Sequence, residues 1–183
     1  MLRSAARFAC TVVLAASSFA QMQMGGAAQD PSKMPSPPAK AEVALNGKSI
    51  TIDYSSPRMR GRKIMGGLVP YGEVWRTGAN PATTLTTPVN LKIGTLEVPA
   101  GTYTLFTLPK QDQWTFIVSK KTGEWGIPYP EGSDFGRTPM TAGKAMSSPQ
   151  ENMTITFENT KGNSTELHVK WENTDEFVKI TAQ

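Results

Sequence analysis

Hydrophobic and polar residues alternate along most of the chain after about residue 40, which is the spacing of a β-strand with one buried face. Residues 98–109, "VPAGTYTLFTLP", turn at Pro99 and Gly101 and continue as a strand that is apolar on both faces, as expected at the centre of a sheet. No stretch keeps a helical period beyond about three turns. Alternating runs occupy residues 50–54, 89–93, 114–118, 153–157, 167–171 and 178–180.

Turn-forming residues separate these runs. Asn46-Gly47 lies between "AEVAL" and "KSITIDY", and this pair favours a type I′ hairpin because both central residues need positive φ. The last three runs are separated by "ENTKGNST" and "ENTD", so they form a predicted antiparallel meander. The chain is therefore expected to be an all-β, single-domain antiparallel β-sandwich, jelly-roll-like, with about eight or nine strands.

Two segments, residues 55–82 and 121–150, interrupt the alternation. Both are far longer than the roughly 4–6 residues that usually connect strands, and such loops are usually functional or disordered. Their large aromatic side chains argue against disorder. We expect both loops to be folded and to pack over one end or one face of the sandwich, with a single helical turn at 72–79. The rings are Tyr71, Trp75, Trp125, Tyr129 and Phe135.

The N-terminus has the pattern of a secretory signal peptide. Arg3 and Arg7 precede the apolar run 8–16, and Ser18-Phe19-Ala20 is a small-x-small cleavage pattern, so cleavage is expected near Ala20. The apolar run is about half the roughly 20 residues of a membrane-spanning helix, so no membrane span is expected. Residues 21–39 are predicted to be a flexible Pro/Gly/Ser linker and residues 40–183 the β-sandwich domain. The protein is predicted to be secreted, to the periplasm or the extracellular space.

Composition excludes several classes of function. The single cysteine, Cys10, lies in the leader, so the mature chain has no disulfide, thiolate metal site or cysteine nucleophile. Without Arg3 and Arg7 the net charge falls from +4 to +2, and the basic residues concentrate around 58–63, so no nucleic-acid partner is expected.

The only histidine is His168, between Leu167 and Val169. It is expected to be a lone surface residue that points away from the core. A serine hydrolase triad, a histidine-rich zinc site and a blue-copper centre all need residues that this chain lacks. No D-x-D-x-D calcium pattern is present, although calcium bound by loop carboxylates stays an open alternative. No metal and no cofactor are therefore predicted.

The first long segment carries the candidate chemistry. In an extended chain Arg58, Arg60 and Arg62 would share one side, as a guanidinium cluster suited to a carboxylate, sulfate or phosphate. Alternatively these arginines pair with Asp53, Glu73 or Asp134, or are simply solvated. The rings could flank a flat ligand or could form a small cluster that holds the loops down, and Asn80-Pro81 could be a structural turn.

The leading hypothesis is a non-enzymatic binding module for an anionic or polar ligand, such as a glycan or an envelope component. One alternative is a hydrolase of a glycan or cell-envelope polymer that uses Glu73 and Asp134 as acid and base. Another is a structural envelope-associated protein without a small-molecule site. Oligomeric state stays open. The candidate ligand-binding residues are Arg58, Arg60, Arg62, Tyr71, Glu73, Trp75, Arg76, Asn80 and Trp125.

Two motifs resemble a known family. "PYGEVWRTGAN" at 70–80 and "PAGTY" at 99–103, preceded by "SPRMRGRKIMGGLV" and followed by "WTFIVSK" and "EWG", are similar to the bacterial secreted proteins of the domain of unknown function 2911 family. The resemblance runs from about residue 40 to the C-terminus. It implies a leader peptide and one β-rich domain, and it implies no activity. Members often have an acidic residue where this chain has Pro81.

Overall fold

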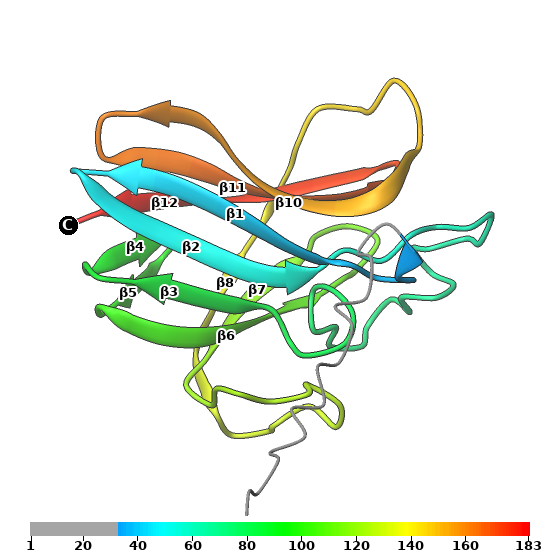
Figure 1. Ribbon diagram of the computed structural model, residues 1–183, viewed down its shortest axis with the longest axis horizontal. Coiled ribbons are helices and arrows are strands. Elements are labelled where there is room, and N and C mark those ends of the chain that lie inside the picture. The colour runs from blue at the N-terminus through cyan, green and yellow to red at the C-terminus, as the bar shows by residue number, and fades with distance from the viewer. Residues whose placement is uncertain (1–32) are drawn as a thin grey trace, which may run out of the picture.

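The structure, a computed structural model, describes residues 33–183 as two antiparallel β-sheets facing each other (Figure 1). The first sheet has the strand order β1-β2-β3-β6-β7-β8, so β1 and β8 are its edges. Its strands are β1 (Pro38–Leu45), β2 (Lys48–Ser55), β3 (Thr84–Thr87), β6 (Gly101–Leu108), β7 (Thr115–Ser119) and β8 (Asp134–Pro139).

The second sheet has the order β10-β11-β12-β4-β5, and β9 pairs with β12 beside this path. Its strands are β10 (Gln150–Lys161), β11 (Ser164–Glu172), β12 (Thr174–Ala182), β4 (Leu91–Ile93), β5 (Leu96–Val98) and β9 (Thr141–Ala142). The predicted all-β antiparallel sandwich is confirmed, with twelve strands in place of the expected eight or nine.

The strongest local signals determine the local structure. Asn46 and Gly47 have φ of 50° and 69°, and Leu45 pairs with Lys48 across this two-residue turn. The C-terminal strands β10, β11 and β12 form the expected meander. Strand β6 is central in the first sheet, and its adjacent residues Leu105 and Phe106 are buried in two different clusters. Burial on both faces explains why this run does not alternate.

Hydrophobic side chains fill the sandwich from both sheets. The alternating phase identified from the sequence supplies them, and burial of this apolar surface is the main contribution to folding. A second cluster of Ala82, Phe106 and Ile117 lies apart from this core, with Tyr129 packed edge-on to Phe106 at a ring separation of 5.0 Å. The main cluster includes Ile50, Ile52, Leu91, Ile93, Phe116, Met153, Leu167, Trp171 and Ile180.

Strands β3, β5, β8 and β9 were not predicted, and β8 and β9 lie in the segment 121–150 that was expected to be a loop. In β8, "DFGRTP", only Thr138 is buried, so the strand has no apolar alternation. It forms through backbone pairing with β7 at the sheet edge. The expected helical turn at 72–79 is also wrong, because Trp75 forms a β-bridge with Thr107 instead.

Strand β1 begins at Pro38, two residues before the expected start of the domain. The predicted signal peptide and linker residues 21–32 lie outside the described residues. Residues 33–183 contain no helix long and apolar enough to cross a membrane.

Candidate functional site

Two long loops meet at one end of the sandwich. The first loop (residues 56–83) connects β2 to β3, and the second loop (residues 120–133) connects β7 to β8. Arg76 Nη1 donates to the carbonyl oxygen of Trp125 at 3.0 Å, and the amide of Ala82 donates to the carbonyl oxygen of Glu124 at 3.1 Å. Gly126 lies so close that a Cβ there would be 2.9 Å from the Cβ of Ala82. The loops therefore pack together, as expected.

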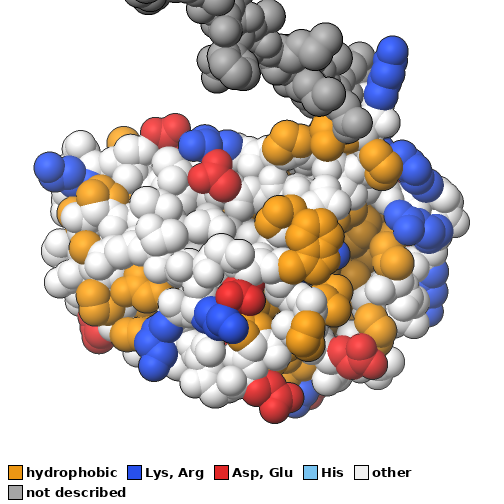
Figure 2. Space-filling model, turned by 60° about the horizontal axis from the view of Figure 1, so that its bottom comes forward, with side chains coloured by type: hydrophobic (Ala, Val, Ile, Leu, Met, Phe, Trp, Pro, Cys, Tyr) orange, Lys and Arg blue, Asp and Glu red, His pale blue; other side chains and the backbone are white. Residues whose placement is uncertain are grey.

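A pocket of about 310 Å³, here called the loop pocket, opens between these loops. Five large apolar side chains and two guanidinium groups line it, together with small residues of the first loop. On the face shown in Figure 2, hydrophobic side chains gather over the right half and Lys and Arg side chains lie along the rim. The apolar lining residues are Leu68, Val69, Trp75, Ile127 and Trp171, and the cationic ones are Arg62 and Arg76.

Trp75 anchors the first loop to the core. Its indole stacks on Trp171 with ring centroids 5.9 Å apart and meets Trp114 edge-on at 6.3 Å. Its Nε1 donates to the carbonyl oxygen of Gly78 at 3.1 Å, and its backbone pairs with Thr107. Trp75 therefore both holds the loop in place and forms a fixed wall of the pocket.

The two arginines of the pocket bond to backbone carbonyls. Arg62 donates from Nε to Met59 and from Nη2 to Arg58, at 2.9 and 2.7 Å, whereas Arg76 donates to Trp125 and lies 5.3 Å above its ring. Burial lowers the pKa of Arg76, although an arginine still stays charged at neutral pH.

Of the three acidic partners considered from the sequence, Asp53 and Asp134 are engaged elsewhere and Glu73 is exposed. Asp53 pairs with Lys40 at 3.3 Å, and Asp134 pairs with Arg137 at 2.7 Å. Among residues 33–183, no carboxylate oxygen lies within 4.0 Å of a side-chain nitrogen of Arg62 or Arg76. No described residue therefore neutralises the positive charge of the loop pocket through a direct ion pair.

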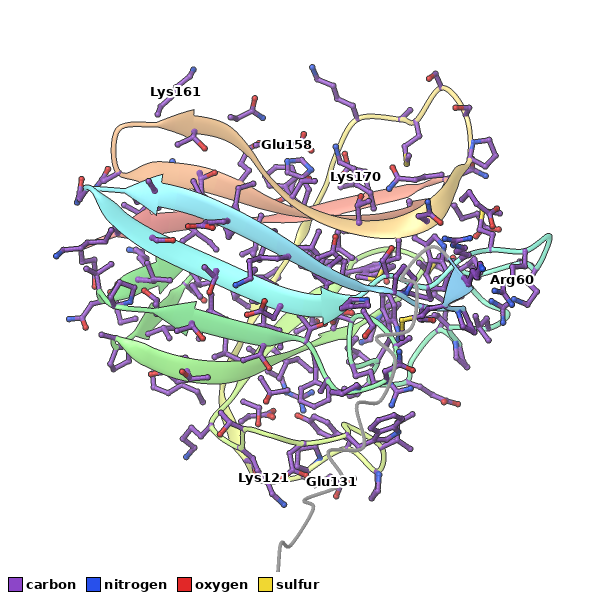
Figure 3. All side chains as sticks on the ribbon, in the orientation of Figure 1. Arg60, Lys121, Glu131, Glu158, Lys161 and Lys170 are labelled. Carbon is purple, nitrogen blue, oxygen red and sulfur yellow. The ribbon has the colours of Figure 1, made fainter. Side chains whose placement is uncertain are left out.

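The expected cluster of Arg58, Arg60 and Arg62 does not form along an extended chain. Arg60 and Gly61 have φ of 50° and 70°, so the backbone turns here and the guanidinium of Arg62 folds back onto the carbonyl of Arg58. Arg58 is half-buried, and its backbone forms an isolated β-bridge with Asn152. Arg60 is exposed at the far end of the loop (Figure 3). Of these three arginines, Arg62 alone lines the pocket.

The remaining candidates surround the pocket. Asn80 has φ of 56° and donates from Nδ2 to the carbonyl oxygen of Ser36 at 3.1 Å, which fixes a residue that lines the pocket. Tyr71 and Glu73 are exposed on the first loop, and the Tyr71 ring packs on Gly66. Trp125 is exposed beside Arg76. These placements make Asn80 a structural residue of the site.

Glu73 and Asp134 lie far apart. Glu73 is next to Gly72, and the amide of Gly72 donates to the carbonyl oxygen of Pro109. Asp134 is the strand partner of Ser119, and Ser119 is in turn the strand partner of Thr104. Thr104 and Pro109 are separated by roughly 16 Å along β6 at about 3.3 Å per residue, beyond the roughly 5–9.5 Å that glycosidase carboxylates need. Asp134 also accepts a hydrogen bond from Tyr129, and burial followed by this carboxylate raises the pKa of Tyr129 to about 12. This geometry gives the hydrolase alternative no support.

His168 differs from its expected state. It points away from the core from β11, yet it is buried. Its Nδ1 lies 2.6 Å from Asp175 Oδ1, its Nε2 lies 3.4 Å from Glu166 Oε2, and its ring stacks on Phe177 at 4.9 Å. The expectation of a lone surface histidine is wrong because neighbouring side chains and the segment 142–144 cover the ring.

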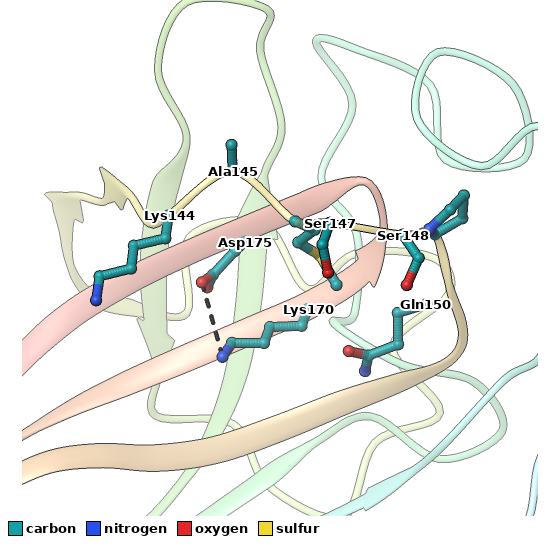
Figure 4. A pocket seen from close by; sticks show the side chains of 9 residues that line it. Lys144, Ala145, Ser147, Ser148, Gln150, Lys170 and Asp175 are labelled. Atoms are coloured by element: carbon teal, nitrogen blue, oxygen red, sulfur yellow. Dashed lines mark ion pairs between the residues drawn. The ribbon is translucent and has the colours of Figure 1, made fainter.

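An ionic network surrounds His168 on this outer face. Lys170 Nζ bonds to Glu158 at 2.6 Å and lies 3.7 Å from Asp175 Oδ2, below the segment 144–150 (Figure 4). The sequence contained a signal for this network, because Glu166, His168 and Lys170 occupy alternate positions of one strand and are all ionisable. Within residues 33–183, no group of three or more His, Cys, Asp or Glu side chains is arranged to hold a metal ion.

Comparison with known proteins gives one match. A family model described as "Protein of unknown function (DUF2911)" matches residues 36–180. Neither curated proteins nor solved structures give a match. The matched range includes both motifs that carry the resemblance, as well as the two loops of the pocket. The resemblance is thus confirmed, and the chain belongs to the DUF2911 family of proteins of unknown function.

Proposed function

We propose that this protein is a non-catalytic binding module that holds a small amphipathic anion in the loop pocket. The observation that carries the proposal is the pair Arg62 and Arg76, which line an otherwise largely apolar pocket and have no carboxylate within 4.0 Å among the described residues. A guanidinium presents several N–H donors in a planar fork that suits carboxylate, sulfate or phosphate.

The size and walls of the pocket restrict the ligand. Pockets for small molecules occupy roughly 300–1,000 Å³ and are mostly apolar with a few polar groups that set orientation. The loop pocket is at the lower end of that range. A ligand with an acidic head and a short apolar group, free or as part of a glycan or an envelope component, matches both features.

We place this function in the periplasm or outside the cell. The proposal rests on the leader pattern at residues 1–20 and on the absence of cysteine after Cys10 in the sequence. The structural alternative, in which the loops only cap the sandwich, does not explain why two arginines without a close carboxylate partner among residues 33–183 face an apolar pocket.

Isothermal titration calorimetry with octyl phosphate tests the proposal. We expect Arg76→Ala to weaken binding by about tenfold to a hundredfold, because a hydrogen bond to a charged group is worth roughly 1.5–3 kcal/mol and each 1.4 kcal/mol is tenfold. Arg60→Ala is the matched control, since Arg60 is a charged residue of the same loop that does not line the pocket. It should leave the affinity nearly unchanged.

Two results would contradict this function. Wild-type protein that releases no heat and shows no thermal stabilisation with octyl phosphate has no such site. Equal losses in Arg76→Ala and Arg60→Ala would assign the binding to diffuse positive charge. The melting temperature of unliganded Arg76→Ala, compared with wild type, separates loss of the ligand contact from loss of the bond to Trp125.

A further inference from the structure

Large hydrophobic side chains are exposed mainly around the loop pocket. Leu68, Tyr71, Trp125 and Ile127, here called the loop surface, are 48%, 39%, 56% and 66% exposed. Leu68 and Ile127 line the pocket, Trp125 lies beside Arg76, and Tyr71 packs on Gly66 of the same loop. On the face drawn in Figure 2, hydrophobic side chains gather over the right half. Exposed hydrophobic groups gathered in one place mark an interaction site.

Positive charge accompanies the loop surface. Arg62 and Arg76 line the pocket together with Leu68 and Ile127, and Arg60 and Lys63 are exposed in the first loop. Among residues 33–183, no carboxylate oxygen lies within 4.0 Å of a side-chain nitrogen of these four residues. Four acidic residues are nearby. Glu73 is exposed, Glu124 pairs with Lys121 at 3.5 Å, Glu151 accepts from the amide of Arg60 at 2.9 Å, and Glu172 accepts from the amides of Ile64 and Met65. The carboxylates of Glu151 and Glu172 are bound to backbone amides of the loop, so the four cationic side chains are left without a direct ion pair among the described residues.

We propose that the loop surface docks on an anionic phospholipid bilayer and that the loop pocket takes its amphipathic ligand from that bilayer. The second half of this inference rests on the proposed function. Tryptophan and tyrosine favour the boundary between headgroups and acyl chains, and clustered Lys and Arg are attracted to anionic lipids. A small ligand free in solution would need the pocket alone, and would leave the exposure of Tyr71 and Trp125 unexplained.

A bilayer fits this surface better than a folded protein partner. Its four apolar side chains come from two loops, and the guanidinium of Arg76 lies against Trp125, so they form a small cluster of separate points and not one continuous apolar area. A stable protein interface needs a continuous, complementary area of roughly 800 Å² on each partner. A fluid bilayer accommodates separate points, because lipids rearrange around each side chain.

The tryptophans provide a specific readout of docking. Trp114 and Trp171 are 3% and 1% exposed and Trp75 is half-buried, so Trp125 is the tryptophan most open to an aqueous quencher. With vesicles of phosphatidylglycerol and phosphatidylcholine in equal parts, we expect the emission to shift to shorter wavelength and acrylamide quenching to fall. Vesicles of phosphatidylcholine alone should produce a much smaller change.

Vesicle co-sedimentation of two variants locates the contact. Trp125→Ser should lower the vesicle partition coefficient by about tenfold, because binding scales with the apolar area inserted. Phe135→Ser is the matched control: Phe135 is also exposed, at 36%, but lies on β8 against Tyr103. Its partition coefficient should equal that of wild type. Equal losses in both variants would overturn the assignment to the loop surface.

Octyl phosphate below its micellar concentration separates this inference from the proposed function. Trp125 does not line the pocket, so Trp125→Ser should still bind octyl phosphate in solution. Protein that binds octyl phosphate but no anionic vesicle would overturn the bilayer inference, leave the pocket function intact and point to a protein partner for the loop surface. Vesicle binding without octyl phosphate binding would support docking and refute the pocket function.

Discussion

At the scale of single residues, Asp175 is the key carboxylate of the network on the outer face of the second sheet. Its side chain is 7% exposed and contacts His168 and Lys170. The amide of Gly143 bonds to its carbonyl oxygen at 2.8 Å, and a Cβ at Gly143 would lie 2.4 Å from its Oδ2. Asp175 therefore joins β12 to β11 through its carboxylate and to the segment that follows β9 through its backbone carbonyl.

Asp175→Asn should lower the free energy of unfolding by about 2 kcal/mol, because it removes a buried carboxylate that contacts His168 and Lys170, and a hydrogen bond to a charged group contributes roughly 1.5–3 kcal/mol. Asp53→Asn is the control, since Asp53 and Lys40 form an exposed pair. Exposed pairs contribute less than about 1 kcal/mol. Urea denaturation measures both values, and similar losses in the two variants would show that burial of Asp175 has no energetic consequence.

Glu176 makes stability depend on pH. Burial, followed by the nearby charge of Asp175, raises its pKa from the ordinary 4.5 to about 7. Between a pH of about 4.5 and about 7, Glu176 is deprotonated in the unfolded chain but still protonated in the folded chain. The free energy of unfolding therefore falls as the pH rises through this range. The loss then persists at higher pH.

Glu176→Gln, which removes the titration, should therefore be more stable than wild type above pH 7 and should flatten the pH dependence below it. Free energies of unfolding from urea titrations across this range provide the measurement. Parallel curves for the two proteins would mean that Glu176 titrates alike in the folded and unfolded chains.

At the scale of elements, contact between the two loops defines the pocket. Gly126 has φ of 85°, and its backbone lies against Ala82 and Arg76. Gly123 of the same second loop has φ of 73° and no atom within 4 Å of an added Cβ. Substitutions at both glycines strain the backbone, but only a substitution at Gly126 disturbs the close approach of the loops. Comparing the two positions therefore separates these effects.

Gly126→Ala should destabilise the protein by more than about 1 kcal/mol and weaken octyl phosphate binding, because the added methyl group pushes the loops apart. Gly123→Ala should show the strain cost alone and keep its affinity. Thermal denaturation and calorimetric titration give the two quantities. Unchanged affinity in Gly126→Ala would show that loop contact does not shape the pocket.

Much of the sandwich is predictable from the sequence because alternation directly reports one buried face. Strands β2, β7, β11 and β12 follow from that pattern, and the Asn46-Gly47 turn from its need for positive φ. Strand β8 is not predictable in this way, since Asp134–Pro139 contributes one buried residue and depends on backbone pairing with β7. Local pattern does not encode such pairing.

The candidate site was predictable in part. The interrupted alternation identified the two long segments, and the candidates Arg62, Trp75 and Arg76 line one pocket. The turn at Arg60, the stacking of Trp75 on Trp171 and the cover over His168 depend on contacts between residues distant in sequence. Sequence alone therefore located the region but did not distinguish the arginine that lines the pocket from those that do not.

At the scale of the whole molecule, the pocket depends on both sheets. The first loop is tied to the second sheet by the bonds of Met59 to Glu151 and Met153 to Pro57, at 2.8 and 2.9 Å. The carboxylate of Glu172 also accepts from the amides of Ile64 and Met65. A ligand held here should therefore stabilise the fold as a unit and raise its melting temperature.

The most direct test of the central claim is an NMR titration with octyl phosphate that follows the indole N–H signals of the four tryptophans. Trp75 and Trp171 line the pocket and donate these protons to Gly78 and Glu151, whereas Trp114 does not line it. We predict that the Trp75 and Trp171 signals move together and saturate, with a much smaller change at Trp114. Signals that stay fixed, or a change confined to Trp125, would contradict a ligand site in the loop pocket.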